Sequence, residues 1–119
     1  METGADLIRL RDLVRAFVAE RDWDQFHTPK NLSAALSVEA AELLEHFQWL
    51  QSGERVELSD AKLQQVRHEL ADVLFYLIRI ADRLDVDLDA AMQEKMALNR
   101  EKYPADKVRG DSRKYTEYE

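Results

Sequence analysis

Residues 28–50 read TPKNLSAALSVEAAELLEHFQWL, a stretch that combines a helix start with a long apolar face. A threonine followed by a proline is typical of a helix N-cap and the first helical position. Apolar side chains then recur at steps of three and four, which keeps them on one face of a helix: Leu32, Leu36, Leu43, Phe47 and Leu50. The pattern predicts a helix from about residue 29 to about residue 50.

Carboxylates interrupt this apolar face. Glu39 falls inside the stripe, and Glu42 stands three residues on, at the edge of the same face. The next predicted helix repeats the spacing with Glu69 and Asp72. Consecutive helices usually pack side by side, so we expect these four carboxylates to converge. Two carboxylates about 4 Å apart repel by roughly 4 kcal/mol, so such a cluster needs shifted pKa values or a hard cation such as Mg²⁺.

The remaining helices follow from caps and breakers. Helices are predicted at about 5–21, 59–84 and 88–102, with Ser59 and Asp87 as caps and Pro104 as a stop. The predicted core stripe of helix 59–84 consists of Leu63, Val66, Leu70, Leu74, Leu77 and Ala81. These elements predict an all-α fold, a four-helix-bundle-like oligomer with one domain at 1–104 and a polar C-terminal tail at 105–119.

Composition narrows the classes of partner. The net charge of −7 disfavours binding to a nucleic-acid polymer, which usually rests on basic patches. No apolar run reaches the roughly 18 residues of a membrane span, and we expect neither membrane insertion nor a secretory signal. The absence of cysteine excludes thiolate chemistry and suits a cytoplasmic location.

A row of polar groups follows the start of the last predicted helix. Lys95, Asn99 and Lys102 continue the face that begins with Leu88 and Met92. Such a row can hold phosphate oxygens through charge-assisted hydrogen bonds. The alternative is an ordinary basic last turn that complements the helix dipole, and the helix alone leaves both interpretations open.

Aromatic side chains gather before and after the helix at 29–50: Trp23, Phe26, His27, Phe47 and Trp49. Tyr76 lies one turn beyond Asp72 on the following helix. Aromatic faces can stack on a nucleobase, although such residues more often belong to a core. A di-iron centre is disfavoured, because it needs Glu-x-x-His pairs and the sequence contains none.

The acidic pairs also resemble a known signature. Glu39-Ala-Ala-Glu42 followed by Glu69-Leu-Ala-Asp72 is similar to the E-x-x-E…E-x-x-D motif of MazG-like pyrophosphohydrolases, in the all-α NTP pyrophosphatase superfamily. The dCTP pyrophosphatase-like branch is closer still. Its features appear as RDWDQFHTPKNL at 21–32, EAAELLEHFQW at 39–49, KMALNREKYP at 95–104 and KYT at 114–116.

The resemblance implies a role for each group of residues. Glu39, Glu42, Glu69 and Asp72 would hold Mg²⁺, with Mn²⁺ as a substitute. The base pocket would include His27, Trp49 and Tyr76, and the phosphates would be held by Lys95, Asn99, Lys102 and Tyr103. The family also implies a homodimer or homotetramer. Many members carry a further glutamate directly before the first motif glutamate, where this chain has Val38, so the general base stays open.

The expected reaction is Mg²⁺-dependent hydrolysis of a nucleoside triphosphate, dCTP or a modified dCTP analogue, to a monophosphate and pyrophosphate, in cleansing of the nucleotide pool. Glu39 is the candidate base, and Lys95 would stabilise the departing pyrophosphate. The alternatives are a dUTPase-like or phosphoribosyl-ATP-type pyrophosphohydrolase, or a non-catalytic helical interaction module. Base preference and the number of metal ions are not determined by the sequence, since stacking tolerates every base.

Overall fold

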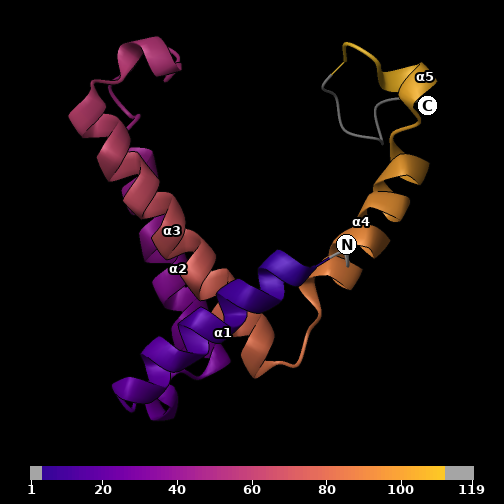
Figure 1. Cartoon of the computed structure of the whole chain (residues 1–119). Helices are drawn as coiled ribbons and strands as arrows, with labels where there is room; N and C mark the ends of the chain where they lie inside the picture. Colours follow the sequence, from indigo (N-terminus) through magenta and orange to yellow (C-terminus); the bar gives the residue numbers. More distant parts are fainter. Residues whose placement is uncertain (1–3, 112–119) are drawn as a thin grey trace. The chain divides into compact units, whose positions relative to one another are not determined.

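The computed structural model describes residues 4–111, and helices are the only regular elements in that range (Figure 1). The long helices are α1 (Ala5–Glu20), α2 (Pro29–Glu45), α3 (Asp60–Arg83) and α4 (Leu88–Lys102). Shorter elements are the 3-10 helices η1 (Asp24–Phe26) and η2 (Arg55–Glu57) and the single-turn helix α5 (Ala105–Val108). The all-α prediction is confirmed.

Three of the long helices begin at the predicted caps. The side chains of Thr28, Ser59 and Asp87 each accept a hydrogen bond of 3.1 Å from the backbone N–H three residues on. Each bond satisfies one of the N–H groups that the first helical turn leaves without a partner. These starts are therefore encoded locally.

The end of α2 differs from the prediction. The helix stops at Glu45 rather than near Leu50, because the chain tightens into turns in which Phe47 N–H bonds the carbonyl of Leu44 at 2.9 Å. The following segment bends back towards α3 through Gly53, whose φ of 78° lies in the left-handed region that favours glycine. Apolar periodicity alone could not detect this turn, since Phe47 and Leu50 continue the helical pattern.

The C-terminal residues divide into two sets. The segment predicted as a polar tail begins with the helix α5, which follows Pro104 directly. Residues 112–119, including the KYT motif at 114–116, lie outside the described residues. The chain separates into two compact units between Val86 and Asp87, so α1 to α3 form the first unit and α4 and α5 belong to the second.

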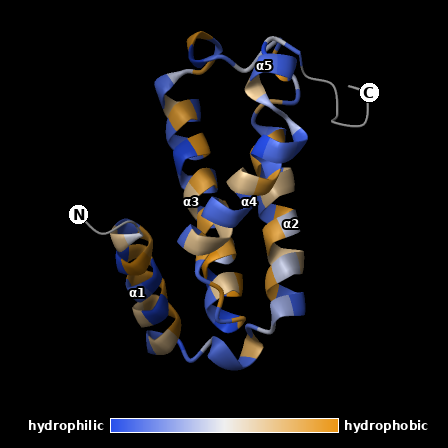
Figure 2. Ribbon diagram, turned by 90° about the vertical axis from the view of Figure 1, so that its right-hand side faces the viewer, coloured by the Kyte–Doolittle hydropathy of each residue, from blue (hydrophilic) through white to orange (hydrophobic). Residues whose placement is uncertain are grey.

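The core of the first unit lies where α3 packs against both α1 and α2 (Figure 1). In Figure 2, apolar and polar residues alternate along each of these helices, as expected for helices with one packed face. The buried apolar side chains are Val18, Leu32, Leu58, Val66, Ile78 and Ala81. Within residues 4–111, none of the helices combines the length and the apolar composition that crossing a bilayer requires.

The predicted core stripe of α3 is only partly correct. Val66 and Ala81 are buried, whereas Leu70, Leu74 and Leu77 are 51%, 37% and 43% exposed. The buried face of α3 carries Val66, Ile78 and Ala81 instead, although α1 and α2 both pack against this helix. Within the first unit, the leucines form an apolar row that is partly exposed.

Candidate functional site

Carboxylates from two helices meet in the first unit. Glu39 comes from α2, and Glu69 and Asp72 come from α3. One carboxylate oxygen from each lies within 4.8 Å of the others. The i, i+3 spacing on consecutive helices predicted that four carboxylates converge, and the packing of α2 along α3 brings three of them together.

Two oxygens of this cluster are buried without a hydrogen bond. Oε2 of Glu39 and Oε1 of Glu69 have no donor within residues 4–111. A buried carboxylate without a compensating partner is strongly unfavourable, so these oxygens need either a proton or a cation. Their orientation therefore fits a site for a hard divalent ion, which is bound by oxygen ligands.

The crowding raises the pKa of Glu39 to about 8. The largest cause is the adjacent Glu69 carboxyl, which a protonated Glu39 can hydrogen-bond, followed by burial and by Glu42. Glu42 is close enough to act on Glu39, but it is not among the three residues whose oxygens lie within 4.8 Å of one another. A divalent cation would replace the proton and favour the charged form of all these groups.

An aromatic row leads away from the carboxylates. Tyr76 is near these carboxylates. Burial raises the pKa of its hydroxyl first, and the charges of Glu39, Asp72 and Glu42 raise it further. From Tyr76 the ring contacts continue to Phe75 at 5.1 Å, and from Phe75 to His27 at 6.5 Å. Two of the three predicted base-pocket residues, His27 and Tyr76, are thus linked through one intervening ring.

Trp49 is not brought to this row. It lies in the turns after α2, is 89% exposed and makes no ring contact with the rest of residues 4–111. Trp23 instead occupies a place in the row, with its ring centroid 6.2 Å from His27 and 5.7 Å from Phe17. The sequence indicates Trp23 as one of the aromatic residues before α2, but the resemblance to the MazG-like family implies no place for it in the base pocket.

The predicted phosphate residues belong to α4, in the second unit. Lys95 is exposed and Asn99 is half-buried, and both lie on one face of the helix with Lys102. Tyr103 forms the C-cap, where its backbone N–H donates to the carbonyl of Asn99 at 2.8 Å. The structure therefore places these four residues along one helix and its end.

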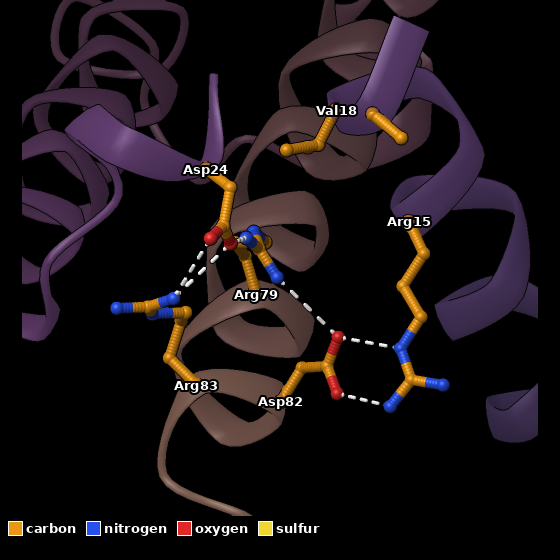
Figure 3. Close-up of a pocket in the computed structure, with 7 residues that line it drawn as sticks. Arg15, Val18, Asp24, Arg79, Asp82 and Arg83 are labelled. Atoms are coloured by element: carbon orange, nitrogen blue, oxygen red, sulfur yellow. Dashed lines mark hydrogen bonds and ion pairs between the residues drawn. The ribbon is translucent and has the colours of Figure 1, made fainter. Parts of the chain in front are cut away.

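An arginine network near α1 was missed by the sequence analysis. Arg79 on α3 is 5% exposed and bonds both Asp24 and Asp82, while Arg83 also bonds Asp24 at 3.1 Å (Figure 3). Arg15 on α1 makes a bidentate contact with Asp82, in which Nε and Nη2 donate to the two carboxylate oxygens at 2.7 and 2.5 Å. These residues line a pocket of about 400 Å³. The only sequence signal was a charged side chain beside the apolar Ile78 and Ile80, and such positions are usually solvent-facing.

Curated relatives share most of this chain. It is 48% identical over 110 residues to dCTP pyrophosphatase 1 of Homo sapiens, and 44% identical over 110 residues to that of Rattus norvegicus. Both alignments cover 91% of this chain and 65% of the relative. The chain thus spans just under two-thirds of the length of the curated relatives it matches.

A solved structure and a family model agree with these matches. The crystal structure of a pyrophosphatase from Archaeoglobus fulgidus superposes with a TM-score of 0.77 at 39% identity, covering 87% of this chain and 97% of the other. The family model described as MazG-like matches residues 34–118, which include both acidic pairs. This chain belongs to the MazG-like family.

Proposed function

We propose that the chain is a Mg²⁺-dependent nucleoside triphosphate pyrophosphohydrolase with dCTP or a modified dCTP analogue as its substrate. The observation that carries the proposal is the carboxylate cluster, in which buried oxygens of Glu39 and Glu69 have no donor among residues 4–111. Two relatives at 44–48% identity are named dCTP pyrophosphatase 1, which supports the choice of base. The expected role is cleansing of the nucleotide pool in the cytoplasm.

The reaction consumes one water and yields a nucleoside monophosphate and pyrophosphate. Glu39, Glu42, Glu69 and Asp72 would hold the metal ion. Bound Mg²⁺ would neutralise charge on the triphosphate and orient the α phosphate. Water attacks the α phosphorus, and the bond from that phosphorus to the bridging oxygen breaks. Glu39 is the candidate acceptor of the water proton, because its carboxylate lies in the cluster beside Glu69 and Asp72.

The remaining residues would bind the substrate. Lys95 and Lys102 offer positive charge to the phosphates and to the departing pyrophosphate, with Asn99 and Tyr103 as further donors. Tyr76 and His27 would contact the base, since their rings are linked to each other through Phe75 beside the carboxylates. Trp49 would also belong to the base pocket, and this role rests only on the family motif at 39–49.

We further propose that the chain works as a homo-oligomer, a dimer or a tetramer. The row of Leu70, Leu74 and Leu77 is more than one-third exposed along its length, although it lies on a central helix. Contiguous apolar surface of this kind is typical of a subunit interface. The strongly exposed Trp49 is a second apolar group that an oligomer could cover.

The proposal is tested with a panel of nucleotides. The purified chain is incubated with each of dCTP, dUTP, dTTP, dATP and dGTP in the presence of Mg²⁺, and products are separated by chromatography. We expect a monophosphate and pyrophosphate, with dCTP consumed fastest and no turnover after chelation of the metal. A different preferred base would indicate another member of the superfamily, such as a dUTPase-like enzyme.

A matched pair of variants separates catalysis from folding. Asp72→Asn removes a cluster carboxylate that is itself exposed, so we expect the helical fold to persist while turnover falls by at least about a hundredfold. Asp89→Asn, in the first turn of α4 and outside the cluster, is the control. Absence of pyrophosphate release from every nucleotide by the wild-type chain would favour a non-catalytic interaction module.

A further inference from the structure

All three nitrogens of the Arg79 guanidinium donate hydrogen bonds, and one of these bonds goes to His27. Its Nε donates to Nδ1 of His27 at 3.1 Å. Its Nη2 bonds Asp24, and its Nη1 bonds Asp82 at 3.4 Å (Figure 3). The two carboxylates fix the plane of the guanidinium, so the direction of the Nε–H bond towards His27 is fixed with it.

This contact determines which ring nitrogen of His27 carries the proton. A guanidinium group has five N–H donors and no acceptor, and it stays protonated in proteins. The Nδ1 atom of His27 must therefore be the acceptor, with its lone pair towards Arg79. In a neutral imidazole the proton is then on Nε2.

The surroundings of His27 also keep its ring neutral. Burial is the largest cause that lowers the pKa of His27, and the charges of Arg79 and Arg83 lower it further. Asp24 acts in the opposite direction and raises the pKa, but the net shift is downwards. A second proton on Nδ1 would point at the Arg79 donor, which is a further reason for the neutral form.

The other ring nitrogen of His27 makes no hydrogen bond to residues 4–111. This nitrogen, Nε2, lies across the imidazole from Nδ1. The ring lies 6.2 Å from Trp23 in a tilted contact and 6.5 Å from Phe75 in an edge-on contact, and Phe75 contacts Tyr76 next to the carboxylates. A half-buried donor near aromatic rings suits the polar edge of a planar, stacked ligand.

We propose that Arg79 is a positioning residue that holds His27 in the neutral Nε2–H form, so that His27 donates a hydrogen bond to an acceptor atom on the edge of the nucleobase. The nucleobase part rests on the proposed function, whereas the tautomer does not. Pyrimidines carry a carbonyl oxygen at C2, and cytosine adds an unprotonated N3, so both acceptors suit a fixed donor. A histidine free to exchange tautomers would present a donor only part of the time.

The tautomer is measured directly on the ligand-free wild-type protein. In ¹⁵N-labelled chain, two-bond correlations from the ring carbon hydrogens distinguish the protonated from the unprotonated nitrogen of each histidine. His27→Gln identifies the His27 signals among those of the three histidines. At neutral pH we expect Nε2 to be protonated and Nδ1 bare. A ring protonated on Nδ1, or on both nitrogens, would overturn the proposal.

Two arginine variants test the cause of this form. Arg79→Met removes the donor to Nδ1, and His27 should then show a mixture of tautomers. Arg83→Met is the matched control, because Arg83 also bonds Asp24 but makes no bond to His27. An unchanged tautomer in Arg79→Met would refute the role of Arg79. If that variant does not fold, Arg79→Lys replaces it, because the shorter reach of the ammonium should also release Nδ1.

Kinetics test the contact with the nucleobase. His27→Leu removes the Nε2 donor, so KM for dCTP should rise roughly tenfold while kcat stays within about twofold. His27→Gln retains an amide N–H near the position of Nε2, and its KM should stay within about threefold of the wild-type value. Equal impairment in both variants, or an unchanged KM in His27→Leu, would reject the donor role.

Failure of this inference differs from failure of the proposed function. An active enzyme whose His27 carries its proton on Nδ1 would reject the inference alone. A wild-type chain that hydrolyses no nucleotide would reject the proposed function and the nucleobase contact with it, while the tautomer measurement would still decide the role of Arg79.

Discussion

At the scale of single residues, Glu39 is a carboxyl group in a place where its charge is unfavourable. It stands within the apolar stripe of α2, it is half-buried, and Oε2 has no donor among the described residues. Its pKa of about 8 means that its charged form is unfavourable at neutral pH in the absence of a cation. An unfavourable group of this kind is typical of a functional site, where activity can cost stability.

Replacing this carboxyl should separate stability from activity. In Glu39→Gln we expect the metal-free protein to gain about 1 kcal/mol, or about 4 °C in Tm, because a neutral amide beside Glu69 and Glu42 needs neither a proton nor a cation. Turnover of dCTP should be lost. Thermal melts in a chelator and pyrophosphate release in Mg²⁺ measure the two effects.

Glu45→Gln is the control for this variant, since Glu45 is exposed at the end of the same helix and outside the cluster. Glu45→Gln should change neither the Tm in a chelator nor the turnover of dCTP. A destabilised Glu39→Gln protein that still turns over dCTP would contradict both the electrostatic account and the assigned role of Glu39.

Gly53 is a residue whose backbone conformation and environment both exclude a side chain. Its φ is +78°, and a Cβ at this position would lie 2.9 Å from Cδ1 of Phe47. Gly53→Ala should therefore lower the free energy of unfolding by about 1–3 kcal/mol. Denaturant unfolding followed by circular dichroism measures the loss.

Gly110→Ala separates the two causes. Gly110 has nearly the same φ, +77°, but a Cβ at this position would have nothing within 4 Å of it. This variant carries the backbone strain without the clash, so its cost should be about 1–2 kcal/mol and smaller than that of Gly53→Ala. Equal costs at the two glycines would show that the Phe47 contact contributes nothing.

At the scale of elements, Glu57 holds the turns that connect α2 to α3. Its carboxylate accepts hydrogen bonds of 2.7–2.9 Å from the backbone N–H groups of Gln51, Ser52 and Gly53 and from the Ser52 hydroxyl. These bonds lower its pKa to about 2, the Ser52 hydroxyl being the largest cause. One side chain therefore holds the backbone at residues 51–53, directly after the turns that carry Trp49.

The depressed pKa predicts an acid-dependent stability. The pKa of Glu57 is 4.5, the ordinary glutamate value, in the unfolded chain and about 2 in the folded chain. Its contribution is therefore fully present above pH 4.5 and is lost as pH falls towards 2. Glu57→Gln should lower Tm at pH 7, and the difference from wild type should shrink below pH 4.5 and vanish near pH 2. Thermal melts across this range measure the difference.

Glu54→Gln is the matched control in the same turn. Glu54 is exposed, and its carboxylate has no hydrogen bond to the turn. The Tm of the Glu54→Gln variant should equal that of the wild type at every pH. A Glu57→Gln difference that persists unchanged at pH 2 would indicate a packing effect rather than loss of the charge.

The helix α3 combines three functions on different faces. Glu69 and Asp72 face α2 and complete the cluster, while Arg79 faces η1 and fixes Asp24 and His27. A third side carries the accessible leucines at 70, 74 and 77. Because these positions repeat at helical spacing, a small rotation of α3 would disturb all three sets together.

At the scale of the whole molecule, the exposed row of Leu70, Leu74 and Leu77 is the proposed subunit interface. Leu70→Glu combined with Leu77→Glu places two charges on the row, and we expect the oligomer to dissociate into monomers at micromolar concentration. Size-exclusion chromatography with light scattering measures the mass. Val56→Glu is the control, because Val56 is 91% exposed in η2 and lies outside the row. A double variant that retains the wild-type mass would place the interface elsewhere.

The sequence by itself determined the features that depend on a few neighbouring residues. The caps at Thr28, Ser59 and Asp87 specify three helix starts, because each side chain bonds a backbone group only three residues away. The acidic pairs could be predicted to converge, since i, i+3 spacing places each pair on one face and consecutive helices pack together. The family motifs added the expected chemistry.

Only the tertiary structure decided which residues meet across longer separations. Arg79 bonds Asp24 and His27 from 55 and 52 residues away, and no local pattern encodes that distance. Burial of Arg79, exposure of the leucine row and separation of Trp49 from the aromatic row all depend on how α1, α2 and α3 are rotated against one another. Periodicity identifies the faces of a helix, but the packing of its neighbours selects which face is covered.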